Sequence, residues 1–208
     1  LEIMRVNLWD TRFYIGEMSN ADDILKEWEP YLQDDSYISD SMWTMAETKS
    51  SIRNEKNKEL PWNVFFESVR PHMNTFLESL DPQVPYNVFC DEMWFNKYEK
   101  GDYQEPHDHA FPGRGISVIY FLDFPDQEKE PGGTLVFECP NFQMIRATGM
   151  DRIFNDYNYQ HITPPLKKGT LIIFPSYISH YVLPNKTDKR RATIAANFVI
   201  TAADKKDE

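Results

Sequence analysis

The spacing of the apolar residues changes once along this chain, near residue 88. Before that point, apolar side chains recur every three to four residues, in residues 20–34 and again in residues 61–80. This spacing is typical of amphipathic helices, and Pro61 stands where a helix can begin while Pro82 would end it. Beyond residue 88, short runs of β-branched and aromatic residues follow a period of two between glycines and prolines, which is typical of strands. The chain should therefore form two helices followed by a series of strands.

The second pattern predicts six strands. They lie near residues 88–98, 115–123, 133–139, 169–174, 179–183 and 191–200. Because turns rather than helices separate these strands, we expect them to pair in antiparallel fashion. The sequence thus indicates an α+β fold, with a double-stranded β-helix (a jelly-roll, cupin-like barrel) and N-terminal helices packed on it.

The chain length favours a single domain, because 208 residues are enough for one sizeable core. We expect a helical part at about 1–85, a barrel core at about 86–202 and a flexible tail at 203–208. Residues 36–59 are rich in polar side chains, which suits a mobile loop or lid better than a regular element. Residues 140–168 form an insertion between two of the predicted strands.

Charge and composition restrict the partners. Thirty-three acidic against 22 basic residues give a net charge of −11, which repels phosphate backbones and disfavours nucleic acid. No apolar run reaches the roughly 20 residues of a membrane span, and the first residues lack a signal-peptide core, so we expect a cytoplasmic protein with no membrane partner. Cys90 and Cys139 are expected to be reduced, buried thiols. The sequence leaves the oligomeric state open.

Three histidines form a candidate metal site. His107 and His109 are two residues apart, so on an extended chain their imidazoles point to the same side. His180 follows a strand-like run, and a neighbouring strand could deliver it to the same point. Neutral imidazole nitrogens suit Fe, Zn, Cu and Ni, so the residue types leave the metal open. Asp108 is an alternative third ligand, although alternation directs it away from the site and suits it better to orienting an imidazole.

A candidate carboxylate-binding strand begins at Arg191. One face of the predicted strand is polar or small, and it carries Arg191, Thr193, Ala195 and Asn197. A guanidinium with a hydroxyl two residues later suits the binding of a carboxylate inside a barrel cavity, where an unpaired charge would be costly. The neighbouring Arg190 is expected to be a solvated residue at the strand end.

The order and spacing of these residues resemble the 2-oxoglutarate/Fe(II) oxygenases of prolyl hydroxylase type. The residues that carry the resemblance are Tyr98, Gly101, His107, His109, Gly132, Gly133, Phe174, His180 and Arg191. The run from Trp94 to Tyr98, followed by Gly101 and the HxH motif, is closer still to a bacterial and phage oxygenase subfamily with an HxH...H metal motif. The resemblance covers about residues 88–200, the whole predicted barrel, and leaves out the helices before it.

The resemblance implies Fe(II), 2-oxoglutarate as cosubstrate and O2. His107 and His180 match two histidine ligands of the metal. The residues that match the cosubstrate pocket are Arg191 for the distal carboxylate, Thr193 for a nearby hydroxyl and Tyr98 for a lining tyrosine. Trp94 and Asn96 share the strand face of Tyr98 and are placed in the wall of the same pocket.

Two positions depart from the family pattern. His109 occupies the place of the usual aspartate, so a third neutral imidazole would leave the iron complex one charge more positive. Phe121 stands where prolyl hydroxylases often carry a second tyrosine for the cosubstrate, so that hydroxyl is missing here.

The implied reaction is the hydroxylation of a small molecule or a protein side chain, coupled to decarboxylation of 2-oxoglutarate to succinate. It needs no catalytic residue beyond the metal ligands. One alternative is a three-histidine cupin that works as a metal dioxygenase or isomerase without 2-oxoglutarate. Such cupins usually carry a glutamate shortly after HxH, whereas residues 110–113 here are Ala-Phe-Pro-Gly. The other alternative, a non-enzymatic structural or binding jelly roll, leaves the ordered set of Tyr98, His180 and Arg191 unexplained.

Overall fold

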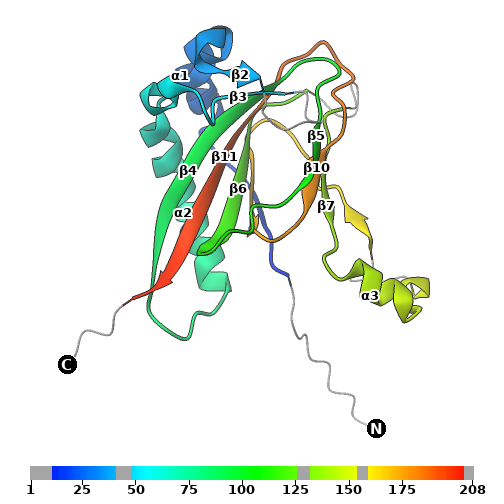
Figure 1. Cartoon of the computed structure of the whole chain (residues 1–208). Helices are drawn as coiled ribbons and strands as arrows, with labels where there is room; N and C mark the ends of the chain where they lie inside the picture. The colour runs from blue at the N-terminus through cyan, green and yellow to red at the C-terminus, as the bar shows by residue number, and fades with distance from the viewer. Residues whose placement is uncertain (1–10, 41–47, 126–131, 154–158, 204–208) are drawn as a thin grey trace, which may run out of the picture.

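Two antiparallel sheets make up the body of the molecule in the computed structural model, which describes residues 11–40, 48–125, 132–153 and 159–203 (Figure 1). The larger sheet contains, in spatial order, β1 (Tyr14–Glu17), β9 (Thr170–Pro175), β6 (Arg114–Asp123), β11 (Arg191–Ala202), β4 (Tyr86–Tyr98), β3 (Lys49–Ser50) and β2 (Ser39–Asp40). The smaller sheet contains β5 (Gln104–His107), β10 (His180–Val182), β7 (Leu135–Glu138) and β8 (His161–Ile162). All six predicted strands are present, and the expected antiparallel pairing is confirmed.

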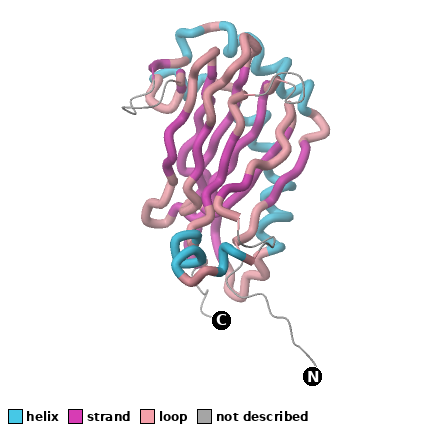
Figure 2. Tube along the Cα trace, turned by 90° about the vertical axis from the view of Figure 1, so that its right-hand side faces the viewer, coloured by secondary structure: helices cyan, strands magenta, loops and turns pink. Residues whose placement is uncertain are grey.

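Two long helices, α1 (Ala21–Gln33) and α2 (Trp62–Ser79), cover the outer face of the larger sheet (Figures 1 and 2). Both lie where the helical spacing predicts them. A short helix, α3 (Phe142–Ala147), lies in the insertion, away from the two long helices. Single 3-10 turns occur at Asp35–Tyr37, Glu55–Glu59 and Met150–Arg152.

The main core lies between the two helices and the larger sheet. Trp28 on α1 packs edge-on against Phe95 on β4, with ring centroids 5.8 Å apart, and Phe65 on α2 lies 5.8 Å from Tyr120 on β6. All four side chains are buried. Each aromatic residue of this size stabilises the fold by about 1.5–3 kcal/mol relative to an exposed one. The helices are therefore held by the apolar stripe that the sequence shows.

A second core lies between the two sheets. Phe137 from the smaller sheet packs edge-on against Phe174 from the larger sheet, with ring centroids 4.9 Å apart. Tyr98, Phe121 and Ile172 belong to the same buried cluster. This cluster holds the two sheets together and leaves room beside it for a cavity.

Strand β11 has one face in the helix-side core and the other face in the cavity between the sheets. Its even-numbered residues from Ala192 to Phe198 are buried in the helix-side core. Its odd-numbered residues from Arg191 to Asn197 line the cavity between the sheets. The predicted division of this strand into an apolar and a polar face is confirmed, because successive side chains of a strand point to opposite faces.

The expectation for residues 36–59 is wrong where the structure describes them. Instead of a loop without elements, β2 and β3 extend the larger sheet, and β3 pairs with β4. The backbone amide of Ser51 donates to the Phe95 carbonyl, and the amide of Phe95 donates to the Ser51 hydroxyl. The edge of the sheet thus orders a segment of low strand propensity. Residues 41–47 lie outside the described part of the chain, as do residues 204–208 of the expected tail.

The expectation for Arg190 is also wrong. Its Nη1 and Nη2 atoms donate to the two carboxylate oxygens of Glu29 on α1, each at 2.8 Å, and its Nε donates to Asp123 on β6 at 2.8 Å. This bidentate pairing holds the pKa of the Glu29 carboxyl below its usual value. Arg190 therefore ties α1 to the sheet beside the cavity.

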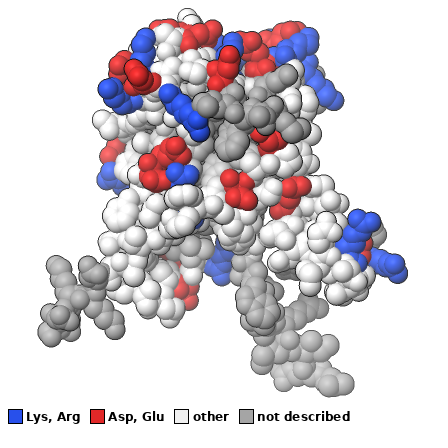
Figure 3. All heavy atoms as spheres, viewed as in Figure 1, with Lys and Arg blue, Asp and Glu red and all other residues white. Residues whose placement is uncertain are grey.

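On the face shown in Figure 3, acidic and basic side chains are interspersed and gather along the upper rim. None of the helices in the described ranges is long and apolar enough to cross a membrane.

Candidate metal and cosubstrate site

A cavity of about 590 Å³ lies between the two sheets. Its walls come from β4, β6 and β11 of the larger sheet, from β5, β7 and β10 of the smaller sheet, and from the β2–β3 region. The site residues predicted from the sequence all line this cavity: His107, His109, His180, Arg191, Thr193, Tyr98 and Asn96. Trp94 lies in the same wall.

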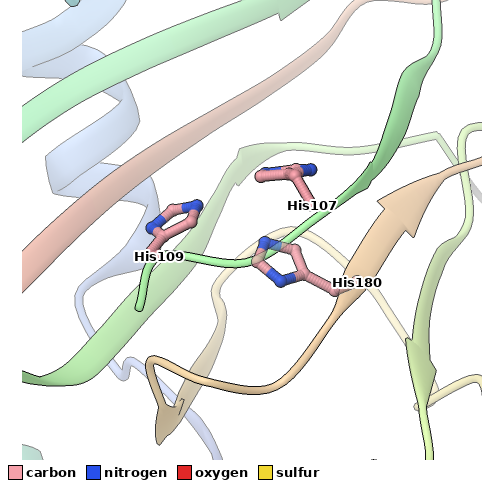
Figure 4. A group of neighbouring side chains, drawn as sticks. All are labelled: His107, His109 and His180. Carbon is pink, nitrogen blue, oxygen red and sulfur yellow. The ribbon is translucent and has the colours of Figure 1, made fainter. Parts of the chain in front are cut away.

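Three imidazoles meet in this cavity, as Figure 4 shows. His107 ends β5, His109 lies in the loop just beyond it, and His180 begins β10. One ring nitrogen from each lies within 4.8 Å of those of the other two. Nitrogens this close can share a single ion, so the three imidazoles could serve together as protein ligands of one metal.

Each of the three imidazoles has an oxygen as partner for its Nδ1 atom. The Nδ1 atom of His107 lies 2.7 Å from the Glu105 carbonyl, and that of His180 lies 3.0 Å from the Ile178 carbonyl. For His109, Nδ1 lies 2.7 Å from the side-chain oxygen of Asn197. A carbonyl oxygen can only accept, so Nδ1 carries the proton in all three rings. This leaves the Nε2 lone pairs free for a metal, the usual arrangement of histidine ligands.

Burial keeps the three imidazoles neutral. It lowers the pKa of His107, lowers the pKa of His109 to about 4, and lowers the pKa of His180 well below its ordinary value. The protonated form is disfavoured because these rings lie away from water. At neutral pH all three rings therefore offer lone pairs, as metal binding requires.

Asp108 takes no part in the cluster of convergent nitrogens. Its carboxylate oxygen accepts a hydrogen bond from the backbone amide of Ala110 at 2.9 Å, which shapes the loop between the strands. The expected role of Asp108 in orienting an imidazole is not what the structure shows. Among the side chains of the described ranges, Asn197 is the one that bonds a ring of the cluster.

Arg191 is buried at the end of the cavity formed by β4, β6 and β11, with 1% of its surface exposed. Its guanidinium stacks on the Tyr98 ring at 4.0 Å and lies 5.6 Å from the rings of both Phe121 and Phe124. These contacts hold the guanidinium plane in one orientation. Phe121, which lacks the hydroxyl of the tyrosine often found there, thus still contacts the arginine.

One nitrogen of this buried guanidinium lacks a partner. The Nε atom of Arg191 donates to the Gly133 carbonyl at 2.8 Å, whereas Nη1 is buried without any hydrogen bond. No acidic side chain in the described part of the chain pairs with Arg191, and burial lowers its pKa. An unpaired buried charge costs several kcal/mol, on the order of what a carboxylate ligand would recover. The residues present therefore fit the distal carboxylate of a dicarboxylate such as 2-oxoglutarate.

Gly133 makes room for the arginine. It adopts a left-handed φ of 59°, and a Cβ atom built there would lie 2.6 Å from Cδ of Arg191. Only glycine allows both this backbone conformation and this close approach. Of the two glycines noted in the sequence, Gly133 is thus required by its backbone conformation and by its contact with Arg191.

Several cavity residues were missed by the sequence analysis. Ser39, Asp40, Thr48, Ser50, Ile52 and Arg53 form the wall contributed by the β2–β3 region. Nothing in their local pattern points to a site, because pairing with a distant strand brings them there. Ser117 and Ser176, which are linked to His109 through Asn197, were missed for the same reason.

The comparison with protein families agrees with this geometry. The sequence model of a family described as "Putative 2OG-Fe(II) oxygenase" matches residues 92–197, just over half of the chain. The chain therefore belongs to this family of 2-oxoglutarate- and Fe(II)-dependent oxygenases. It is a dioxygenase that uses Fe(II), 2-oxoglutarate and O2, and the resemblance found in the sequence is confirmed. The match decides against the cupin without 2-oxoglutarate and against the non-enzymatic jelly roll. A search of curated proteins found no match.

Solved structures of similar fold include two prolyl hydroxylases and a protein with 2-oxoglutarate bound. A prolyl-4-hydroxylase from Pseudomonas putida matches with a TM-score of 0.58 at 17% identity, covering 90% of this chain and 91% of that one. A prolyl hydroxylase from Trichoplax adhaerens, in complex with a peptide fragment of a hypoxia-inducible factor, matches at 0.57 and 13% identity, covering 90% and 83%. HygX from Streptomyces hygroscopicus, with nickel and 2-oxoglutarate bound, matches at 0.56 and 11% identity, covering 91% and 83%. These likenesses confirm the jelly-roll fold.

Proposed function

We propose that His107, His109 and His180 hold Fe(II) through their Nε2 atoms and that Arg191 anchors 2-oxoglutarate in the same cavity. The observation that carries this proposal is the placement of a buried guanidinium, with its Nη1 atom unpartnered, in the cavity into which three neutral imidazoles converge. A dianionic cosubstrate could bind both the guanidinium and a metal held by the imidazoles. Its distal carboxylate would pair with Arg191, and its oxo-acid end would reach the metal.

The chain's own residues bind and orient the reactants. The ring of Tyr98 stacks on the Arg191 guanidinium and orients it. The buried Thr193 lies two residues beyond Arg191 on the same face of β11. Asn96 adds an amide to the wall. When bound, Fe(II) with O2 supplies the oxidising chemistry that converts 2-oxoglutarate to succinate and CO2 and hydroxylates the substrate. No acid or base residue is needed for this role.

The substrate is proposed to be a small molecule or a protein side chain. A cavity of about 590 Å³ falls within the usual range for small-molecule sites, and it can hold a cosubstrate together with part of a second reactant. Residues 1–208 are proposed to act as one oxygenase domain. Cys90 and Cys139 are both free thiols, and both are half-buried rather than buried as expected. A cytoplasmic location is proposed because free thiols suit a reducing compartment.

The proposed site is tested by an anaerobic titration of metal-free protein, first with Fe(II) and then with 2-oxoglutarate. Chelation of the oxo-acid by iron should produce a weak charge-transfer absorption near roughly 500 nm. Succinate, which lacks the oxo group, serves as the matched control and should leave the spectrum unchanged. Failure of 2-oxoglutarate to produce the band in protein that has bound Fe(II) would refute the proposed cosubstrate site.

A further inference from the structure

The three histidines are held in place in two different ways, two of them by backbone carbonyls and one by a side chain. His107 and His180 face each other in the pairing of β5 with β10, and the Nδ1 atom of each bonds a backbone carbonyl two residues earlier. His109 lies beyond the end of β5, where the strand pairing does not reach. Its partner is a side chain on a different strand, Asn197 on β11.

His109 and three other residues, Asn197, Ser117 and Ser176, form a closed ring of hydrogen bonds. The Nδ1 atom of His109 and the Ser117 hydroxyl both bond the side-chain oxygen of Asn197, at 2.7 and 2.9 Å. The hydroxyls of Ser117 and Ser176 lie 2.9 Å apart, and the backbone amide of His109 donates to the Ser176 carbonyl at 2.9 Å. Asn197, Ser117 and Ser176 are each 1% exposed. The ring therefore fixes both the backbone and the imidazole of His109 from inside the fold.

We propose that Asn197, itself oriented by Ser117 and Ser176, is the positioning residue that makes an imidazole work as the third metal ligand. This inference rests on the proposed function, in which His109 binds the metal. By accepting the Nδ1 proton, Asn197 selects the ring tautomer and the ring orientation that present the Nε2 lone pair to the cavity.

The need for such a residue follows from the chemistry of the ligand at this position. A carboxylate has two equivalent oxygens and no tautomers, so it can bind a metal without a partner that takes a proton. An imidazole has two distinct nitrogens, and one of the two tautomers places a proton where the metal should be. Asn197 should therefore matter for metal binding when residue 109 is His and matter little when it is Asp.

A double-mutant cycle tests this dependence. Co(II) affinity is measured by anaerobic calorimetric titration for the wild type, Asn197→Ala, His109→Asp and the double variant. We expect Asn197→Ala to weaken Co(II) binding by about 10-fold or more in the wild type, the usual effect of removing a residue that orients a ligand. In the His109→Asp background the same change should weaken it by less than about 3-fold. Equal losses in both backgrounds would overturn the inference, because a general structural role predicts them.

Further variants distinguish a role of Asn197 in positioning His109 from a role in packing. Asn197→Asp keeps an acceptor oxygen and should retain Co(II) affinity, whereas Asn197→Leu keeps the volume without an acceptor and should match Asn197→Ala. Retained affinity in Asn197→Leu would overturn the inference. Asn87→Ala, on an exposed part of β4, is the control for the host sheet and should leave affinity unchanged. Thermal unfolding of each variant confirms that it is folded.

Ser117→Ala provides a second test in case Asn197→Ala does not fold. Ser117→Ala leaves the Nδ1 contact in place and removes one bond that orients the amide, so it should weaken Co(II) binding by a smaller factor, and only when residue 109 is His. A loss that persists in the His109→Asp background would overturn the inference. Wild-type protein that binds Co(II) no better than His180→Ala would overturn the metal centre and this inference with it, whereas tight wild-type binding without coupling would overturn the inference alone.

Discussion

His180 on β10 lies directly opposite His107 on β5 in the antiparallel pairing of the smaller sheet, with ring centroids 4.4 Å apart. Strand register, rather than a flexible loop, thus sets the distance between these two imidazoles. The third, His109, is 5.2 Å from His107 and 5.1 Å from His180 between ring centroids. The proposed metal centre therefore depends on the pairing of two strands that are far apart in the sequence.

Replacing either histidine of this strand pair should remove the metal and keep the fold. We expect His107→Ala and His180→Ala to lose stoichiometric Fe(II) binding, because two imidazoles alone hold the ion weakly. His180 packs between Phe137 and Phe174, so its removal should also cost about 0.5–3 kcal/mol of stability. Metal content after anaerobic loading, together with circular dichroism, checks both points. Full Fe(II) occupancy in either variant would contradict the assignment.

The two neighbouring arginines should behave in opposite ways. Arg191→Ala should bind Fe(II) normally and lose about 1.5–3 kcal/mol of 2-oxoglutarate affinity, the scale of a hydrogen bond to a charged group. Arg190→Ala is the matched control. It breaks the pairing with Glu29 and Asp123, so it should lower stability by about 1 kcal/mol and leave 2-oxoglutarate affinity unchanged. Equal 2-oxoglutarate affinities for wild type and Arg191→Ala would show that the cosubstrate binds elsewhere.

Gly133 should be needed for the cosubstrate but not for the metal. Gly133→Ala places a Cβ atom 2.6 Å from Cδ of Arg191, so the guanidinium must shift and 2-oxoglutarate affinity should fall by about 10-fold or more. Gly149→Ala introduces a similar backbone strain, at a φ of 74°, with no atom within 4 Å of the new methyl group. That control should cost about 1 kcal/mol of stability and leave cosubstrate binding intact. Titrations of both variants with 2-oxoglutarate compare the two effects, and equal affinities would contradict the prediction.

The metal-free protein should lose stability as the pH falls from about 6.5 to about 4. Burial lowers the pKa of His109 from the model-peptide value of 6.5 to about 4, so in this window the unfolded chain binds more protons than the folded one. The stabilising contribution is complete above the unfolded pKa and is lost as the pH falls towards the folded one. Urea unfolding in the presence of a chelator, at pH 7.5 and pH 5, measures the change. His109→Ala should show a smaller decrease, and an equal decrease would contradict this source of pH dependence.

The fold was largely predictable because its two periodicities are clear. The helical stripe that includes Trp28 and Phe65 and the alternating strand that begins at Arg191 each carry their own signal. Strand β5 was not predicted, because its run from Gln104 to His107 contains a proline and no apolar alternation. It becomes a strand only by pairing with β10.

The candidate site was predictable where one residue type carries the chemistry. Spacing, together with the family resemblance, singled out His107, His109, His180 and Arg191, and the structure brings all four into one cavity. Partners that depend on the folded chain could not be recognised, such as the two backbone carbonyls and Asn197 that bond the imidazoles. Arg190 was misread as solvated for the same reason, because its partner Glu29 lies on a helix distant in sequence.

In the proposed site, three imidazoles and one buried arginine hold Fe(II) and 2-oxoglutarate in one cavity. The most direct measurement is a crystal structure of the protein grown anaerobically with Fe(II) and 2-oxoglutarate. We expect the metal on the Nε2 atoms of His107, His109 and His180, with the distal carboxylate of 2-oxoglutarate on Arg191. A carboxylate oxygen of Asp108 on the metal with His109 turned away, or a cosubstrate that leaves Arg191 unpaired, would contradict it.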